Sequence, residues 1–177
     1  CRFCQAGMIY RPVRERSCET LLELAQRLIE NTGYEEISLA SLSISDYTQI
    51  EKLTTDLLGW TDEKNVSLSL PSLRADSFTK ELMDKIATVR SSSLTFAPEA
   101  GTQRLRDVIN KNVFEDDLKR AVNVAFDAGK TQVKLYFMNG LPTETSEDLE
   151  GIANLAKTVV EEYYKNPNRR KGKSPQV

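Results

Sequence analysis

The sequence predicts an α/β fold in which parallel strands alternate with the helices that cover them. Short segments with apolar residues at every second position alternate with longer segments at helical spacing, and the cycle repeats roughly every 30 residues, the size of one βα unit. Strands separated by helices of about ten or more residues join through crossovers, which makes the strands parallel. We expect four such strands within the 177 residues.

The first cycle begins with a helix, which a strand and a second helix follow. Leucines recur at helical spacing between Ser17, which suits an N-cap, and Gly33, which suits a helix stop. Residues 35–43 form an extended run. Helical spacing returns from Tyr47 onward, and Gly59 is expected to end this second helix.

The next two cycles repeat this order. Residues 66–70 alternate as a strand does, and residues 78–89 carry the spacing of the helix that follows. Residues 94–97 predict a third strand that Pro98 closes. A short helix is expected after it, over residues 102–109.

The last cycle places a strand between two longer helices. Helical spacing over residues 118–125 ends at Gly129. Residues 132–138 alternate as the fourth strand, which a turn at 139–142 breaks. Thr145 is expected to cap the final long helix.

The ends of the chain indicate that it is a piece of a longer protein. Residues 1–164 are assigned to one α/β domain, and a preceding strand is expected because the chain opens with a cysteine-containing loop. Residues 165–177 are polar and lack an apolar period. They are interpreted as a linker toward a further strand.

Composition excludes several classes of function. The 24 Lys and Arg residues against 26 Asp and Glu residues give a formal charge of −2, which argues against general capture of nucleic acid or anionic membranes. No apolar run reaches the roughly 20 residues that span a bilayer, and no leader starts the chain, so a cytoplasmic location is expected. The absence of histidine excludes histidine-based nucleophile dyads and histidine-ligated zinc. Chemistry is expected from carboxylates, lysines, cysteines or a cofactor.

Polar or turn-forming residues follow each predicted strand, among them Ser43, Arg74, Glu99 and Gly140. The carboxyl ends of parallel strands meet at one edge, so the four loops together favour one functional site. The alternative is that polar residues are common where loops begin and that Ser43 only caps a helix. Likewise, Glu99 and Lys111 would only form an ion pair with each other, and Arg74 would only contact Asp76 or a loop carbonyl.

The pair Cys1 and Cys4 forms a CxxC motif that can aim two thiolates at one point. The spacing suits zinc, a redox disulfide or an iron–sulfur cluster. Zinc is disfavoured, because a structural zinc needs four ligands and the chain has no histidine and only the distant Cys18 to add. A cluster would need at least one further cysteine upstream.

Three motifs occur in order along the chain. They are Cys1-Arg2-Phe3-Cys4-Gln5-Ala6-Gly7, then Glu99-Ala100-Gly101-Thr102-Gln103 followed by Ile109-Asn110-Lys111, and finally Gly140-Leu141-Pro142-Thr143-Glu144. The first resembles the second half of the CxxxCxxC signature of radical S-adenosylmethionine (radical SAM) enzymes. The second and third resemble the elements that follow the fourth and fifth strands of that family.

The resemblance implies a fold and a reaction. The chain would supply the central four strands of a partial (βα)6 TIM-like barrel. A [4Fe-4S] cluster would be held by three cysteines, with Cys1 and Cys4 as two of them. Reductive cleavage of S-adenosylmethionine (SAM) would release a 5'-deoxyadenosyl radical that modifies a substrate.

The resemblance also implies roles at the SAM site. Glu99 would accept hydrogen bonds from the ribose hydroxyls, Lys111 would pair with the SAM carboxylate, and Gly140 would let the backbone approach the adenine. Ser43 is only a candidate for the SAM amine, since Ser41-Leu42-Ser43 stands where many members carry a GGE-like turn. Arg74 is a candidate for SAM or substrate.

One departure concerns the cluster. The first cysteine of the signature, expected four positions before Cys1, is not in the chain, and Cys18 cannot replace it. We therefore expect this chain alone to lack both cluster and SAM and to be inactive. The segments 5–12 and 71–74 look most like an uncharacterised bacterial radical SAM group whose core follows a cobalamin-binding-like region. That group is related to methylthiotransferase and coproporphyrinogen oxidase-like branches, so cobalamin is a further possible cofactor of the whole protein.

The expected partners follow from the same resemblance. They are a substrate that is a small molecule or an RNA, and an electron donor such as flavodoxin or ferredoxin. Self-association through uncovered sheet edges is also expected. The alternative function is a non-catalytic α/β domain whose CxxC serves thiol redox chemistry or partner binding.

Overall fold

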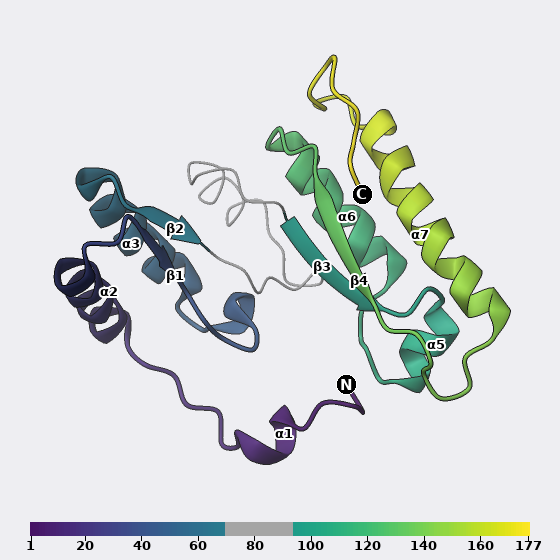
Figure 1. Ribbon diagram of the computed structural model, residues 1–177, viewed down its shortest axis with the longest axis horizontal. Helices are drawn as coiled ribbons and strands as arrows, with labels where there is room; N and C mark the ends of the chain where they lie inside the picture. The colour runs from purple at the N-terminus through teal and green to yellow at the C-terminus, as the bar shows by residue number, and fades with distance from the viewer. Residues whose placement is uncertain (70–93) are drawn as a thin grey trace.

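The computed structural model describes residues 1–69 and 94–177 and shows an α/β chain (Figure 1). The elements run in the order α1 (Ala6–Ile9), α2 (Cys18–Thr32), β1 (Glu36–Ser38), the 3-10 helix η1 (Ile44–Asp46), α3 (Ile50–Lys64), β2 (Ser67–Ser69), β3 (Leu94–Glu99), α5 (Gln103–Val108), α6 (Glu115–Asp127), β4 (Val133–Phe137) and α7 (Ser146–Lys165). None of the helices in these two ranges is both long and apolar enough to cross a membrane.

The four strands form two parallel pairs, which confirms the predicted strand direction. β1 pairs with β2, with Ile37 opposite Leu68, and β3 pairs with β4, with Leu94 opposite Val133. In the described residues the pairs are two separate two-stranded sheets, whereas the sequence predicted one set of four strands. Their arrangement as the centre of a barrel stays a prediction.

The β1–β2 region is covered by α2 and α3. Ile37 and Leu68 from the strands are buried with Leu57, and α2 adds apolar side chains to the same cluster. The prediction that Gly59 ends α3 was wrong, because the helix continues to Lys64. Leu57 and Thr61, one on each side of the glycine, are both buried, so packing stabilises the helix against the cost of about 1 kcal/mol of an internal glycine.

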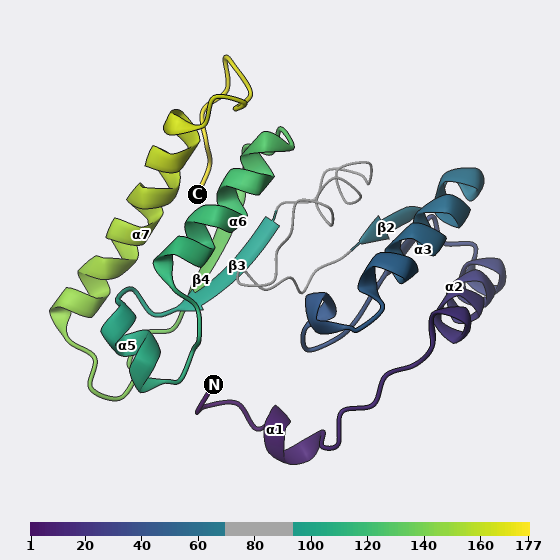
Figure 2. The ribbon, with the colours of Figure 1, turned by 180° about the vertical axis from the view of Figure 1, so that it is seen from behind.

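The β3–β4 region has the larger core, because α6 and α7 cover one face of its strands (Figure 2). Phe96 of β3 is buried against these helices. Phe126 and Tyr163 meet edge to face, with ring centroids 5.0 Å apart. Ile50, at the start of α3, also packs against this core and so joins the two regions.

Most of the predicted helix starts are confirmed. Ser17 accepts a hydrogen bond from the backbone N–H of Thr20, and Thr102 accepts one from Leu105. Thr145 is the N-cap of α7. The helix predicted at 78–89 lies outside the described residues.

β3 differs from its prediction, because it continues through Pro98 to Glu99. Proline has no N–H to donate to a partner strand. The pairing with β4 shifts register between Phe96 and Glu99, which accommodates the proline inside the strand.

The segment 165–177 is polar, as the sequence shows, and it is bonded to the helices. The Tyr163 hydroxyl donates to the carbonyls of Arg170 and Lys173, at 2.9 and 3.0 Å. Gln176 forms a parallel bridge with Gln132, directly before β4. The segment therefore reaches the free edge of β4, where a further parallel strand would lie.

Candidate functional site

The carboxyl ends of β3 and β4 lie next to each other. The backbone N–H of Met138, just after β4, donates to the carbonyl oxygen of Glu99 at 2.8 Å. Parallel pairing thus places Glu99 beside the loop that contains Gly140, as the sequence predicted for strand ends.

Glu99 and Lys111 bind each other, with 3.3 Å between Lys111 Nζ and Glu99 Oε1. Their side chains are 17% and 20% exposed, so solvent reaches both charges only partly. Glu99 also has a φ of +70°, a backbone conformation that is costly for a residue with a Cβ. The chain therefore holds a carboxylate where glycine would fit with less strain, which is typical of a functional position.

The CxxC segment folds into a turn beside this ion pair. The Cys4 N–H donates to the Cys1 carbonyl at 3.3 Å, and both thiols are free and exposed. The Arg2 N–H donates to the Ile109 carbonyl at 2.8 Å, only two residues before Lys111. The turn is thus brought to the same strand-end edge as the ion pair.

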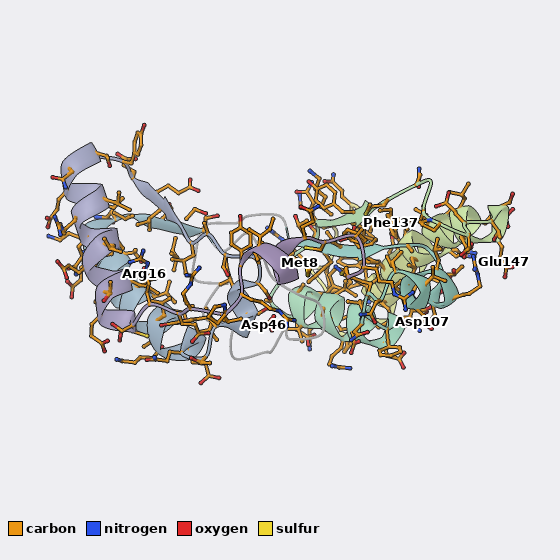
Figure 3. The ribbon with its side chains drawn as sticks, turned by 90° about the horizontal axis from the view of Figure 1, so that it is seen from below. Met8, Arg16, Asp46, Asp107, Phe137 and Glu147 are labelled. Atoms are coloured by element: carbon orange, nitrogen blue, oxygen red, sulfur yellow. The ribbon has the colours of Figure 1, made fainter. Side chains whose placement is uncertain are left out.

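The pictures agree with this placement. Figures 1 and 2 show the N-terminus and α1 on the side of the molecule where β3 and β4 end. Figure 3, viewed from that side, shows Met8 of α1 on the near face. Met8 is exposed, so α1 is not buried under other described elements.

The described residues contain only some of the ligands that an iron–sulfur cluster needs. Two exposed thiols in one turn are the ligand type that an iron–sulfur cluster needs. Cys18 is buried elsewhere, with its Sγ 3.5 Å from the Tyr47 hydroxyl oxygen. Across residues 1–69 and 94–177, no group of three His, Cys, Asp or Glu side chains could hold a metal ion. The described residues therefore fit two of the ligands of such a cluster and supply no third.

Gly140 lies in a loop that needs a glycine. Its φ is +80°, and a Cβ built there would meet nothing within 4 Å. Its N–H donates to the Glu144 carboxylate at 3.0 Å. The loop is thus held by its own carboxylate, with open space beside Gly140.

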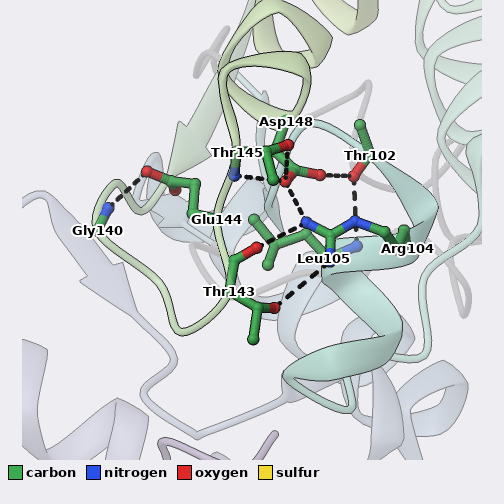
Figure 4. Close-up of polar contacts among 8 residues, drawn as sticks. All are labelled: Thr102, Arg104, Leu105, Gly140, Thr143, Glu144, Thr145 and Asp148. Atoms are coloured by element: carbon green, nitrogen blue, oxygen red, sulfur yellow. Dashed lines mark hydrogen bonds and ion pairs between the residues drawn. The ribbon is translucent and has the colours of Figure 1, made fainter.

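Asp148 joins the loops that follow β3 and β4, and the sequence analysis did not single it out (Figure 4). Its buried carboxylate accepts hydrogen bonds from the Thr102 hydroxyl, from Arg104, and from the N–H and hydroxyl of Thr145. The bond from Thr102, followed by those from Thr145 and Arg104, lowers the pKa of Asp148 well below its ordinary value although burial opposes this. A capping-box pattern with Thr145 was the one local signal for it.

Arg106 is a second residue that sequence reasoning missed. Its guanidinium is buried and donates to the Ala100 carbonyl at 2.9 Å and to the side chain of Gln103. Burial lowers the pKa of Arg106, since the charged form loses water. Arg106 thereby supports the turn that directly follows Glu99.

The remaining predicted residues are not joined to this group. Ser43 lies at the N-cap position of η1, but its side chain makes no capping hydrogen bond. Among the side-chain oxygens and nitrogens of the described residues, Ser43 Oγ is buried and has no hydrogen-bond partner. Burying such a hydroxyl costs free energy unless a ligand or another segment supplies a hydrogen-bond partner. No described hydrogen bond connects Ser43 with Glu99 or Lys111. Arg74 lies outside the described residues.

Two comparisons with known proteins bear on this geometry. The family model described as the Radical SAM superfamily matches residues 1–156. The chain is also 40% identical, over 165 residues, to the uncharacterized protein MJ0966 of Methanocaldococcus jannaschii. That match covers 93% of this chain and 36% of the relative, so the chain spans about a third of the relative's length.

Proposed function

The chain belongs to the radical SAM superfamily, and we propose that it is part of an enzyme that cleaves SAM reductively to a 5'-deoxyadenosyl radical. The single observation that carries the proposal is the position of the Glu99–Lys111 pair. Ile109, two residues before Lys111, contacts the Cys1–Cys4 turn, and Glu99 contacts Met138, two residues before Gly140. A ligand with a carboxylate, a ribose and a flat base needs such a series of contacts.

We propose that Glu99 and Lys111 exchange their mutual contact for contacts with SAM. Lys111 Nζ would pair with the SAM carboxylate, and the freed Glu99 carboxylate would accept hydrogen bonds from the ribose hydroxyls. Because SAM would give each of these largely buried groups a new partner, opening the pair would leave neither charge uncompensated. The adenine would lie at Gly140, where the missing side chain leaves room.

Cys1 and Cys4 are proposed as two of the three ligands of a [4Fe-4S] cluster, the third coming from outside the described residues. When bound, such a cluster supplies the electron for the cleavage. This chain's own contribution is to aim two thiolates at one point through the Cys1–Cys4 turn. The contact between Arg2 and Ile109 keeps that point next to Lys111.

The finer assignments from the sequence remain proposals. They are the four central strands of a (βα)6 barrel, cobalamin as a further cofactor of the whole protein, a flavodoxin or ferredoxin as electron donor, and self-association through sheet edges. The substrate is proposed to be a small molecule or an RNA. Arg2, in the cysteine turn, and Arg11, just after α1, are exposed and would favour an anionic substrate.

The test is binding of SAM to the complete protein, measured as thermal protection and by titration calorimetry. Saturating SAM should raise the melting temperature by mass action. Lys111→Ala should remove most of this protection, whereas Lys157→Ala, an exposed change on α7, should keep it. No protection of the unchanged protein, or equal protection of the Lys111 variant, contradicts the proposal.

The exposure of both thiols in one turn supports the second candidate, a thiol redox or partner-binding pair. This candidate predicts a reversible disulfide between Cys1 and Cys4 in glutathione buffers, together with no response to SAM. Mass spectrometry after alkylation of the remaining thiols measures the disulfide.

A further inference from the structure

We propose that Arg104 and Asp148 are positioning residues that hold the two loops of the nucleoside site in one fixed geometry. The inference rests on the proposed SAM site and concerns residues that do not contact SAM in that proposal. It begins from the loops after β3 and β4, which come from different βα units and are joined by these two side chains (Figure 4).

Asp148 is the common acceptor of this group, and its side chain is only 2% exposed. From the loop after β3 it accepts from the Thr102 hydroxyl. From the loop after β4 it accepts from the N–H and the hydroxyl of Thr145, each at 2.8 Å. One buried carboxylate therefore receives donors from both loops.

Arg104 extends the link to the middle of the loop after β4. One guanidinium nitrogen donates to Asp148 and, at 2.9 Å, to the Thr143 carbonyl, and the other lies 3.4 Å from the Thr143 hydroxyl. Thr143 has a φ of +66°, which a threonine adopts only when its surroundings hold it there. The planar fork of arginine can serve these acceptors together, which the single ammonium of lysine cannot.

The backbone of the loop after β3 also touches the backbone of α7 without an intervening side chain. A Cβ at Gly101 would overlap the backbone of Asp148 and Ile152, and a Cβ at Gly151 would overlap Gly101. A shift of the turn that starts α7 must therefore move Gly101, which is two residues from Glu99. The geometry at Glu99 and at Gly140 is thus set jointly through one contact region.

This placement predicts a specific effect on ligand binding. Arg104 is 50% exposed, so replacing it should leave the protein folded. Without the Arg104 guanidinium, Thr143 can leave its strained conformation, and the loop over 140–145 no longer keeps a single conformation. SAM binding should weaken although no SAM contact is removed.

The test compares Arg104→Lys with Arg27→Lys, the same chemical change on the exposed face of α2. In the complete protein we expect Arg104→Lys to weaken SAM binding about 10-fold, as loss of a supporting contact typically does, with little change in melting temperature. Arg27→Lys should bind SAM as the unchanged protein does. Amide hydrogen exchange over 140–145 without SAM should be faster in Arg104→Lys and unchanged in Arg27→Lys. Asp148→Asn should likewise weaken SAM binding and speed this exchange.

The outcomes separate this inference from the proposed function. If the unchanged protein binds SAM and Lys111→Ala does not, but folded Arg104→Lys binds and exchanges like the unchanged protein, the positioning role is overturned. If the unchanged protein fails to bind SAM, the proposed function fails. In that case faster exchange over 140–145 in Arg104→Lys still supports the loop-holding role, and unchanged exchange overturns it.

Discussion

The two regions of the molecule share a pattern and differ at their strand ends. The β1–β2 and β3–β4 regions are both parallel pairs covered by helices. After β1, the segment 39–43 is largely exposed and ends at Ser43, whose buried hydroxyl has no described partner. After β3 and β4, the two loops are linked through Arg104 at the start of α5 and Asp148 at the start of α7. Within residues 1–69 and 94–177, no such link is described after β1, whereas the loops after β3 and β4 are linked and form what we call the closed strand end.

The difference indicates which part of the site exists before a ligand arrives. Loops that are already bonded lose little conformational freedom on binding, so their contacts contribute more fully to affinity. The proposed nucleoside end at Glu99 and Gly140 is of this kind. The Ser43 end would gain its partner only from a ligand or another segment.

The largest expected effect comes from Gly101→Ala, which adds a methyl group where the closed strand end packs against α7. The new methyl group would overlap the backbone of α7, which cannot move without breaking the Asp148 contacts. We expect a loss of about 4 kcal/mol or more in the free energy of unfolding. Urea denaturation followed by circular dichroism measures it.

The matched control lies in the other region. Gly59 is inside α3, and a Cβ there would meet nothing within 4 Å. Gly59→Ala should stabilise the protein by up to about 1 kcal/mol, because alanine favours helix over glycine. A neutral Gly101→Ala would show that the closed strand end is loosely packed and would remove the contrast between the regions.

A change in the core of the β1–β2 region tests whether the two regions unfold together. Leu57→Ala should cost about 3 kcal/mol, since a fully buried leucine leaves a cavity. Trp60, the chain's one tryptophan, lies in the same cluster and reports on this region by fluorescence. Because Ile50 packs against the other core, fluorescence and circular dichroism should give one transition. Two transitions would mean that the regions are independent.

A smaller effect is expected from Tyr163→Phe in the β3–β4 region. The change keeps the ring against Phe126 and removes the hydroxyl that holds residues 170–173. We expect a loss of about 1 kcal/mol and faster proteolysis within 166–177. Tyr164→Phe, the exposed neighbour, is the control and should change neither property. Equal proteolysis of both variants would show that the hydroxyl does not secure this segment.

The smallest effect concerns Glu19 and Lys52, which join α2 to α3. The hydrogen bond from Lys52, followed by those from the Glu19 backbone and Ser17, lowers the pKa of Glu19 from 4.5 to about 2. A lowered pKa means stabilisation that is present above pH 4.5 and disappears as the pH falls through about 2. Glu19→Gln should therefore lower the melting temperature slightly at neutral pH, and the difference should shrink in acid and in high salt. A difference that is constant with pH would contradict this assignment.

The sequence predicted the features that depend on local chemistry. The capping positions of Ser17 and Thr145 follow from residue types that favour the starts of their own helices. Gly59 was wrongly predicted to end a helix, because packing of α3 on both sides of it outweighs its low helix propensity. The short helix α1 was not predicted, since it is a single turn without buried residues.

The sequence analysis named residues at the strand ends, whose roles stay predictions, but not the side chains that support these loops. Glu99 and Lys111 were identified through the family resemblance, and the structure places them in contact. Asp148 could be found only as a capping residue of α7. Arg104 gave no local signal, because its partners lie some 40 residues away along the chain and its helix position is typical of an exposed cation. Contacts between distant loops depend on strand pairing, which a local pattern does not specify.

The bridge between Gln132 and Gln176 sets an order of events during protein synthesis. The ribosome makes β4 well before the segment that comes to lie along its edge, so the nascent chain first presents an open row of backbone groups. That row gains its partner at Gln132 only after Gln176 has emerged. During this interval the edge can pair with another chain, a contact that the bridge at Gln132 later competes with.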